Sequence, residues 1–242
     1  MNEDNKKNGQ KLICFDLDDT LIDDNYKFEL TFCECIKAII NSLETRTPQI
    51  DDMLEKAREI ENQTWETWPK EDLYTPKRVV NAWVKTYEWF ANEIPLPVRE
   101  HTKNLIEALI MSNYDPPYFV IPGVVETIVD IRQKGYKMHI VTLGPEIQQR
   151  RKLTVSKLLH YFDDVHYETH DKCKPLSKLK EEFGEGNVTM IGNSMRTDIN
   201  PALSLDIDAV YIPRGNWHRF QAEPINNKYK EVDDIRKLTE IF

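Results

Sequence analysis

Three aspartates, Asp16, Asp18 and Asp19, follow directly behind an apolar run in the segment "ICFDLDDTL". An ionised carboxylate beside a buried strand costs several kcal/mol unless another group compensates its charge. Side chains two positions apart in an extended chain share a side, so Asp16 and Asp18 can serve one site while Asp19 points away. The spacing therefore indicates a site built on Asp16 and Asp18, with its compensating positive charge supplied from elsewhere in the chain.

Two other apolar segments also end in polar groups. The segment "HIVT" ends at Thr142, and "MIGNSMRTD" contains Asn193 and, shortly after it, Asp198. The carboxyl ends of parallel strands lie on one edge of a sheet, so these groups are expected to meet the aspartates there. Oxygen ligands of this kind suit Mg²⁺, which binds through a few carboxylates and keeps several waters. Capping of the following helix is the competing interpretation for Asn193 and Asp198.

A lysine from the segment "HDKCKP" would add a second positive charge to this edge. Both Lys172 and Lys174 are candidates, and the spacing to the apolar residues of the next helix favours Lys172. A metal ion and a lysine would neutralise a phosphate group, Thr142 would donate a hydrogen bond to its oxygens, and a carboxylate would attack the phosphorus. The pattern predicts phosphoryl chemistry.

The elements that must position these groups are predicted by the hydrophobic pattern. Residues 11–16 read as a short buried strand, and from residue 118 onward predicted helices and apolar strands alternate up to a closing helix at 231–242. Strands that are continuous apolar runs indicate a parallel sheet covered on both faces. We therefore expect an α/β fold, a Rossmann-like three-layer core around a parallel sheet. Trp217 and His218 follow the last predicted strand and could reach the rim of the site, but loop packing is the favoured interpretation.

A long block between the first strand and this α/β region has helical periodicity throughout. It contains about four predicted helices and no strand, which is enough for a small bundle. The predicted domains are a discontinuous α/β catalytic core, residues 1–22 and 118–242, and a helical cap, residues 23–117.

The predicted cap is rich in aromatic residues. Helical spacing assigns Trp83 and Tyr87 to the bundle core. Trp65, Trp68 and Trp89 are left open as substrate contacts.

Composition limits the functional classes. The formal net charge of -9 disfavours a nucleic-acid polymer as partner, because phosphate-backbone binders normally show a basic face. The hydrophobic stretches are too short to span a bilayer, and the polar start "MNEDNKKNGQK" does not resemble a secretory signal. The four cysteines form no CxxC pair, so neither a zinc site nor a disulfide framework is expected. A cytoplasmic location is the expectation, with the oligomeric state left open.

Four motifs in this order resemble those of the haloacid dehalogenase-like (HAD) hydrolases. They are "DLDDT" behind a strand, "VT" at a second strand end, a downstream lysine, and "IGNSMRTD" at a further strand end. The resemblance spans almost all of the α/β region, and the inserted helices match a helical cap placed between the first two motifs. It implies a Mg²⁺-dependent phosphatase that hydrolyses a small phosphate monoester, such as a nucleotide or a sugar phosphate.

The resemblance also implies roles for individual residues. Asp16 is expected to be the nucleophile that forms an aspartyl-phosphate and ligates Mg²⁺. Asp18 is expected to be the general acid/base, with its backbone carbonyl on the metal. Asp19 is interpreted as structural, and Thr20 as a support of the same loop.

Two features depart from the family pattern or leave it ambiguous. The fourth motif most often begins with Asp, whereas this chain has Asn193, whose amide oxygen brings no charge; the metal site is therefore expected to be weaker, with Asp198 binding directly or through water. Lys174 matches the family's frequent Lys-Pro pair, so the choice of the active-site lysine stays open between Lys172 and Lys174.

The alternative functions are a phosphomutase or a haloacid dehalogenase of the same fold, or a catalytically weak binding or regulatory protein. The presence of Asp18 disfavours the dehalogenase.

Overall fold

The structure, a computed structural model, describes residues 9–44, 46–215 and 222–242. The chain forms two units. The first unit contains the chain up to Asn25 and from Pro117 onward, and the second contains Tyr26–Pro116. The second unit is therefore an insertion into the first.

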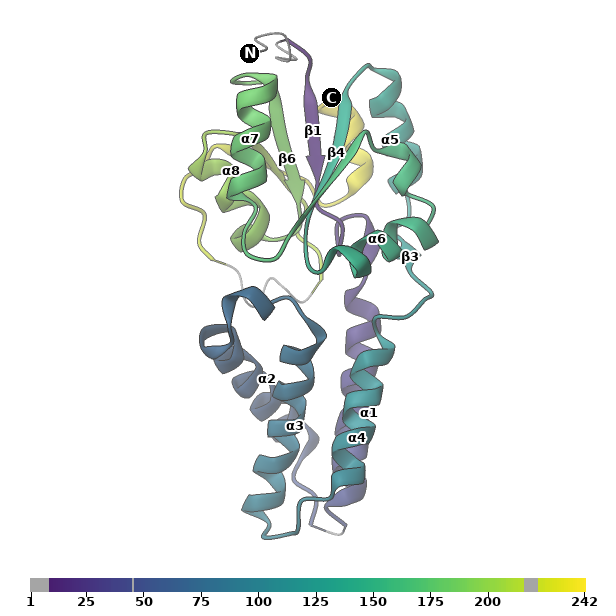
Figure 1. The fold of residues 1–242 in the computed structure, drawn as a ribbon, viewed down its shortest axis with the longest axis vertical. Coiled ribbons are helices and arrows are strands. Elements are labelled where there is room, and N and C mark those ends of the chain that lie inside the picture. Colours follow the sequence, from purple (N-terminus) through teal and green to yellow (C-terminus); the bar gives the residue numbers. More distant parts are fainter. Residues whose placement is uncertain (1–8, 45, 216–221) are drawn as a thin grey trace. The chain divides into compact units, whose positions relative to one another are not determined.

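A six-stranded parallel sheet forms the centre of the first unit (Figure 1). In spatial order its strands are β5 (Asp164–Glu168), β4 (Lys137–Leu143), β1 (Leu12–Phe15), β6 (Val188–Gly192), β7 (Asp208–Tyr211) and β8 (Tyr229–Glu231). The chain adds β4 and β5 on one side of β1 and β6, β7 and β8 on the other, so the order switches direction at β1. In open α/β sheets such a switch point is where sites are placed.

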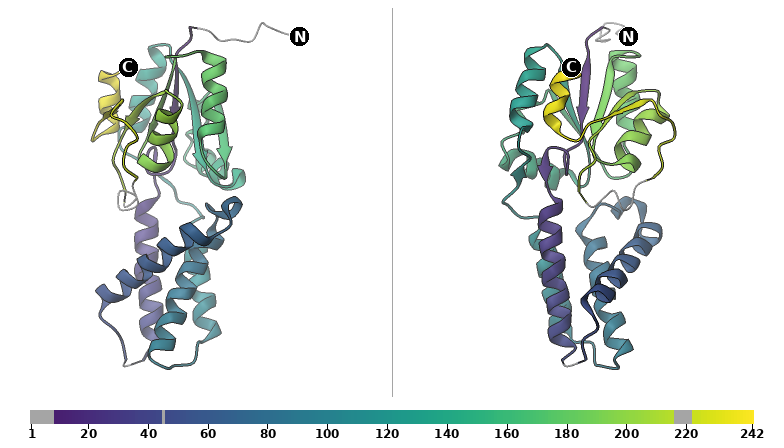
Figure 2. Two further views of the ribbon diagram at one scale, coloured as in Figure 1. Left: turned by 90° about the vertical axis from the view of Figure 1, so that its left-hand side faces the viewer. Right: turned by 180° about the vertical axis from the view of Figure 1, so that it is seen from behind.

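Helices cover both faces of this sheet (Figures 1 and 2). The helices of this unit are α5 (Val124–Gln133), α7 (Cys173–Phe183) and α8 (Asn200–Ser204) on the faces and α6 (Glu146–Val155) at the carboxyl ends of the strands, with 3₁₀-helices at Leu159–Tyr161 and Ile235–Glu240. Alternate residues of β1 point to opposite faces. Ile13 and Phe15 pack in the core that includes α5 residues, and Leu12 and Cys14 pack in the core that includes α7 residues. Burial on both faces explains the continuous apolar run of β1. The predicted α/β fold with a Rossmann-like parallel sheet is confirmed.

Three local elements differ from the sequence-based expectations. The closing helix expected over 231–242 is a shorter 3₁₀-helix, Ile235–Glu240, and it is preceded by the edge strand β8, which was not expected. The polar sequence "YKE" of β8 gives no apolar run, because an edge strand is only partly buried. The short strands β2 (Ile22–Asp23) and β3 (Phe119–Val120) form an antiparallel pair that was not expected. The helix expected after β6 begins as a π-helical turn, Met195–Ile199, that runs into α8.

The second unit is a helical bundle with its own core. Its helices are α1 (Asn25–Ser42, which begins one residue before the unit), α2 (Ile50–Thr67), α3 (Pro76–Glu93) and α4 (Glu100–Ser112), with a 3₁₀-turn at Lys70–Asp72. Trp83 and Tyr87 are buried in this core, as their helical spacing predicted. Among the helices of the described ranges, none combines the length and the apolar composition needed to cross a bilayer.

Candidate active site

The sheet brings the predicted groups to its carboxyl edge. Phe15 of β1 pairs with Ile140 of β4 and with Ile191 of β6, so the residues after these positions lie side by side. The Asp16 N–H donates to the Ile191 carbonyl at 2.9 Å, which fixes Asp16 beside the end of β6. Thr142 is buried near the end of β4. The common edge therefore follows from strand register.

Lys172 lies between two carboxylates of this edge. Its Nζ donates to Asp16 Oδ1 at 2.5 Å and to Asp198 Oδ1 at 2.7 Å. The side chains of Lys172 and Asp198 are each 1% exposed. Within the described part of the chain, no hydrogen bond or ion pair joins Lys174 to these carboxylates. Of the two lysine candidates, Lys172 is the one that the fold brings to Asp16.

The charges of this cluster control one another because water is excluded. Burial raises the pKa of Asp16 to about 7; Asp198 adds to this effect and Lys172 opposes it. Burial also disfavours the charged form of Lys172, but the carboxylates of Asp16 and Asp198 outweigh it and hold the Lys172 pKa above its usual range. Lys172 is therefore a permanent cation that compensates much of the buried negative charge.

Asn193 faces Asp16 across the Thr20 hydroxyl. Thr20 Oγ1 lies 3.1 Å from Asp16 Oδ2 and 3.2 Å from Asn193 Oδ1, and it can donate to either oxygen. The amide group is oriented from its other side, because Asn193 Nδ2 donates to the Arg214 carbonyl at 3.2 Å. The following turn is capped by Ser194, whose side chain accepts the Thr197 N–H. The capping interpretation of Asn193 is therefore wrong for this structure.

Asp198 is held inside the turn that follows β6. Its Oδ2 accepts the Ser194 N–H at 2.8 Å, and its Oδ1 accepts from Lys172. A Cβ atom at Gly192 would lie 2.3 Å from Asp198 Oδ2, so only glycine lets the carboxylate approach the strand this closely. The Asp198 carboxylate therefore binds the turn and Lys172, and α8 has no side-chain cap hydrogen bond.

Oxygen atoms of this cluster could hold a hard cation. Asp16 Oδ2 and Asn193 Oδ1 approach the same hydroxyl, which places one carboxylate oxygen and one amide oxygen together. Both oxygens of Asp198 already accept hydrogen bonds. A donor set made of oxygens alone fits Mg²⁺ and does not favour soft metals. Asp16 and Asn193 are thus the side chains best placed to ligate it.

Asp18 is held by two residues of α6 that the sequence reasoning missed. Lys152 Nζ donates to Asp18 Oδ1 at 2.8 Å and to Asp24 Oδ2 at 3.0 Å. Gln149 Nε2 lies 2.8 Å from Asp18 Oδ2 and 2.7 Å from Thr142 Oγ1. Burial disfavours the charged Lys152, but Asp18 and Asp24 outweigh it and hold its pKa above the usual range. Gln149 thus links the Asp18 carboxylate to Thr142.

A sequence signal for these two residues exists in α6. Gln149, Lys152 and Leu153 are its buried residues, so two of three buried positions are polar. Positions three apart lie on one face of a helix. A helix that presents Gln and Lys where apolar side chains are expected would have indicated polar partners on the sheet edge.

Asp19 has the structural role expected of it. Its backbone adopts φ 59°, in the left-handed region, and its side chain is buried. Its Oδ1 accepts the N–H groups of Asp24 and Asn25 at 3.1 and 2.8 Å, at the start of α1. Burial raises the Asp19 pKa to about 7. The third aspartate of the motif therefore shapes the loop that carries the other two.

Two of the three tryptophans left open, Trp65 and Trp89, have ring contacts within the helical unit, and the role of Trp68 stays open. The Arg78 guanidinium lies 3.8 Å from the Trp65 ring centroid, and Tyr74 packs edge-on against the same ring. Trp89 packs against Phe90. These contacts give Trp65 and Trp89 a packing role within the helical unit, and a contact of either ring with substrate stays a prediction. Trp217 and His218 lie outside the described residues.

Comparisons with known proteins agree with this geometry. A model of the haloacid dehalogenase-like hydrolases matches residues 10–206. A glyceraldehyde 3-phosphate phosphatase of Methanothermobacter thermautotrophicus is 26% identical over 96% of this chain and 99% of its own length. The fold resembles a HAD-like hydrolase of Xanthomonas campestris, with a TM-score of 0.72 and 20% identity over 96% of this chain and 94% of the other. It also resembles a Bacillus subtilis HAD hydrolase solved with bound magnesium, with a TM-score of 0.66 and 19% identity over 96% and 98% of the two chains. The family match covers most of the sequence, and the chain belongs to the haloacid dehalogenase-like hydrolases.

Proposed function

We propose that the protein is a Mg²⁺-dependent phosphatase of small phosphate monoesters that acts through an aspartyl-phosphate on Asp16. The observation that carries this proposal is the buried Lys172, bound to both Asp16 and Asp198 at the end of β1. A permanent cation against a buried carboxylate is suited to an anionic substrate that must approach that carboxylate. The phosphatase name of the Methanothermobacter relative supports the reaction class.

The first step transfers the phosphoryl group to the protein. A carboxylate oxygen of Asp16 attacks phosphorus, the bond from phosphorus to the ester oxygen breaks, and Asp18 gives a proton to the leaving oxygen. Lys172 offsets negative charge on the phosphoryl oxygens, and the Thr142 hydroxyl donates a hydrogen bond to one of them. Lys152 and Gln149 orient the Asp18 carboxyl for this proton transfer.

The second step regenerates Asp16. The Asp18 carboxylate takes a proton from water, the resulting hydroxide attacks phosphorus, and the bond to Asp16 breaks with release of inorganic phosphate. Asp16 and Asn193, with the Asp18 backbone carbonyl, would hold Mg²⁺. When bound, the metal supplies charge that draws the phosphate oxygens toward Asp16. Asn193 contributes no charge, so we expect weaker metal binding than with an aspartate at this position.

The substrate is proposed to be a small phosphorylated metabolite. Glyceraldehyde 3-phosphate is the first compound to test, because the Methanothermobacter relative is named a phosphatase of that compound. The helical unit, inserted between β1 and β4, is proposed to act as a cap that selects the substrate. The negative net charge disfavours a nucleic-acid polymer. The four free cysteines accord with a cytoplasmic setting, which we also propose.

Asp18 separates this function from dehalogenation of a haloacid. A dehalogenase of this fold shares the nucleophile but has no use for an acid/base at this position. The fold places two side chains, Lys152 and Gln149, on the Asp18 carboxyl. A carboxyl group held in this way favours a reaction in which Asp18 donates or accepts a proton.

The test is phosphate release from glyceraldehyde 3-phosphate and from a generic aryl phosphate, each with Mg²⁺ or with a chelator. We expect turnover that needs Mg²⁺ and falls by about 10⁴-fold or more in Asp16→Asn, as for other lost nucleophiles. Asp208→Asn, the same substitution at an exposed position at the start of β7, is the matched control and should stay active. Turnover that persists in Asp16→Asn, or a wild type inactive on a panel of natural phosphate esters, would refute the proposal.

A further inference from the structure

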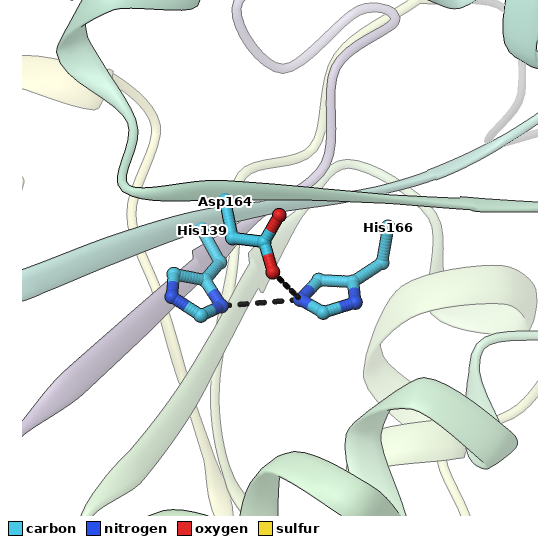
Figure 3. A group of neighbouring side chains, drawn as sticks. All are labelled: His139, Asp164 and His166. Carbon is cyan, nitrogen blue, oxygen red and sulfur yellow. Dashed lines mark hydrogen bonds and ion pairs between the residues drawn. The ribbon is translucent and has the colours of Figure 1, made fainter.

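Two histidines and an aspartate meet at the edge of the sheet (Figure 3). His139 lies in β4, and Asp164 and His166 lie in the edge strand β5. The register pairs His139 with Asp164, and residues two apart in a strand share a face. Strand pairing therefore places all three side chains on the same face of the sheet.

The distances between these side chains suit a metal ion. His139 Nδ1 and His166 Nε2 are 3.1 Å apart, and Asp164 Oδ2 is 3.8 Å from the same His166 nitrogen. One ligand atom from each residue lies within 4.8 Å of the others. Nitrogens at this separation, each at a zinc–nitrogen bond length, would subtend an angle of about 100° at the metal, close to tetrahedral. The rings can also share a hydrogen bond, which a metal ion would replace.

The surroundings favour a cation. The ring of His139 is 3% exposed and packs edge-on against Phe183 of α7, with a centroid distance of 5.8 Å. Asp164 is exposed, so a metal ion can enter from the solvent side. The charges of Asp164, Glu182 and Glu168 act on His166 and are opposed by Lys178. Three of these four charged groups are carboxylates, so the charge around His166 favours a divalent cation.

The location separates this group from the chemistry of the strand ends. His139 precedes Thr142 by three residues, which is about 10 Å along an extended strand. His139 also lies beside Phe183 on the α7 face. A metal ion bound here would join the edge strand β5 to β4 without contacting Asp16.

We propose that His139, Asp164 and His166 form a binding site for a divalent transition metal of the zinc class that fastens β5 to β4. Imidazole nitrogens and one carboxylate suit zinc, cobalt and nickel, and they disfavour Mg²⁺, which prefers oxygen ligands. Three protein ligands leave a fourth position for water. The site is independent of the proposed phosphatase reaction.

The test titrates metal-stripped full-length protein with Zn²⁺ by calorimetry, in the presence of excess Mg²⁺. We expect one equivalent to bind with micromolar or tighter affinity and to raise the melting temperature. His166→Ala should weaken this binding by about 100-fold or more, since even outer-sphere changes cost 10–100-fold. Asp164→Asn, an isosteric change at an exposed position, should weaken it while leaving the fold intact. His101→Ala, at an exposed position in α4, is the matched control and should bind as the wild type does.

Co²⁺ spectra distinguish this site from adventitious binding to cysteine. The proposal predicts visible bands of a nitrogen- and oxygen-ligated, near-tetrahedral ion in the wild type and in His101→Ala, and their loss in His166→Ala. A thiolate charge-transfer band would instead place the metal on a cysteine and overturn the proposal. Absence of binding up to millimolar Zn²⁺, or equal affinity in the wild type, His166→Ala and Asp164→Asn, would also overturn it.

Discussion

Replacement of Lys172 by methionine removes the positive charge between Asp16 and Asp198 while keeping most of the side-chain volume. The two ion pairs span 2.5 and 2.7 Å. At an effective dielectric constant of about 20, each is worth roughly 6 kcal/mol of Coulomb energy before desolvation is counted. Breaking a buried pair costs about 3–5 kcal/mol net, because it leaves a buried carboxylate without its compensating charge. Uptake of a proton by that carboxylate keeps the loss below the full Coulomb energy.

The same change alters the reactivity of Asp16. Burial already raises the pKa of Asp16 to about 7, and Lys172 is the group that opposes this rise. Without it the pKa moves higher, so more of Asp16 is the neutral acid, which is a poor nucleophile. We expect kcat/KM at neutral pH to fall by about 10²–10³-fold, and the acidic limb of the rate profile to move to higher pH.

Urea unfolding and phosphate release measure the two effects on one preparation. In chelator, Lys172→Met should lose about 3–5 kcal/mol of unfolding free energy. Added Mg²⁺ should stabilise Lys172→Met more than the wild type, because no ammonium group offsets the charge of Asp16 in the variant. Lys174→Met, the same substitution two residues along α7, is the control and should change neither quantity strongly. A stable, active Lys172→Met beside an inactive Lys174→Met would refute the reasoning.

Three further changes test separate parts of the structure. Lys152→Met removes the hydrogen bonds to Asp18 and Asp24, and we expect kcat to fall about 10–100-fold with little change in KM. An unchanged kcat in steady-state kinetics would contradict the positioning role of Lys152. Arg78→Met breaks the buried ion pair with Glu61 and the hydrogen bonds to Leu73 and Thr64, so it should cost about 3 kcal/mol. Chemical unfolding followed by tryptophan fluorescence measures this loss. Asp234→Ala removes the cap of the last 3₁₀-helix and should cost about 1 kcal/mol at pH 7. Hydrogen bonds from the Arg236 side chain and backbone lower the Asp234 pKa to about 2. That stability is therefore present above the unfolded-state pKa of about 4 and is lost as pH falls toward 2, where the variant and the wild type should converge.

The layered fold was predictable because each strand of the sheet interior leaves a local signal. Burial of β1 on both faces requires the run "LICF", and the groups after it had to lie at the carboxyl edge. The edge strand β8 gave no such signal, because its exposed positions tolerate the polar sequence "YKE". Exposure of β8 therefore explains why this strand was missed while the central strands were identified.

The site was predictable as far as local sequence decides it. Asp16 and Asn193 follow strands, so topology alone brings them together. Spacing favoured Lys172 and the Lys-Pro pair favoured Lys174, and the structure brings Lys172 to Asp16. Lys152 was missed although its buried helical position carries a signal.

The histidine group shows a stronger limit of sequence reasoning. His139 and His166 are separated by 27 residues in the chain. Only the pairing register of β4 and β5 brings their rings together. Two ligands this far apart match no metal-binding spacing motif that can be read from the sequence.

The most direct test of the central claim is to trap the phosphorylated protein. The wild type would be mixed with Mg²⁺ and a substrate radiolabelled in its phosphoryl group, and the reaction would be quenched in acid within one turnover. The protein would then be digested for peptide mapping. The proposed mechanism predicts label on the peptide that contains Asp16, released by hydroxylamine as expected for an acyl phosphate, and absent in Asp16→Asn. Label on a different residue, or rapid turnover with no labelled protein at any quench time, would contradict it.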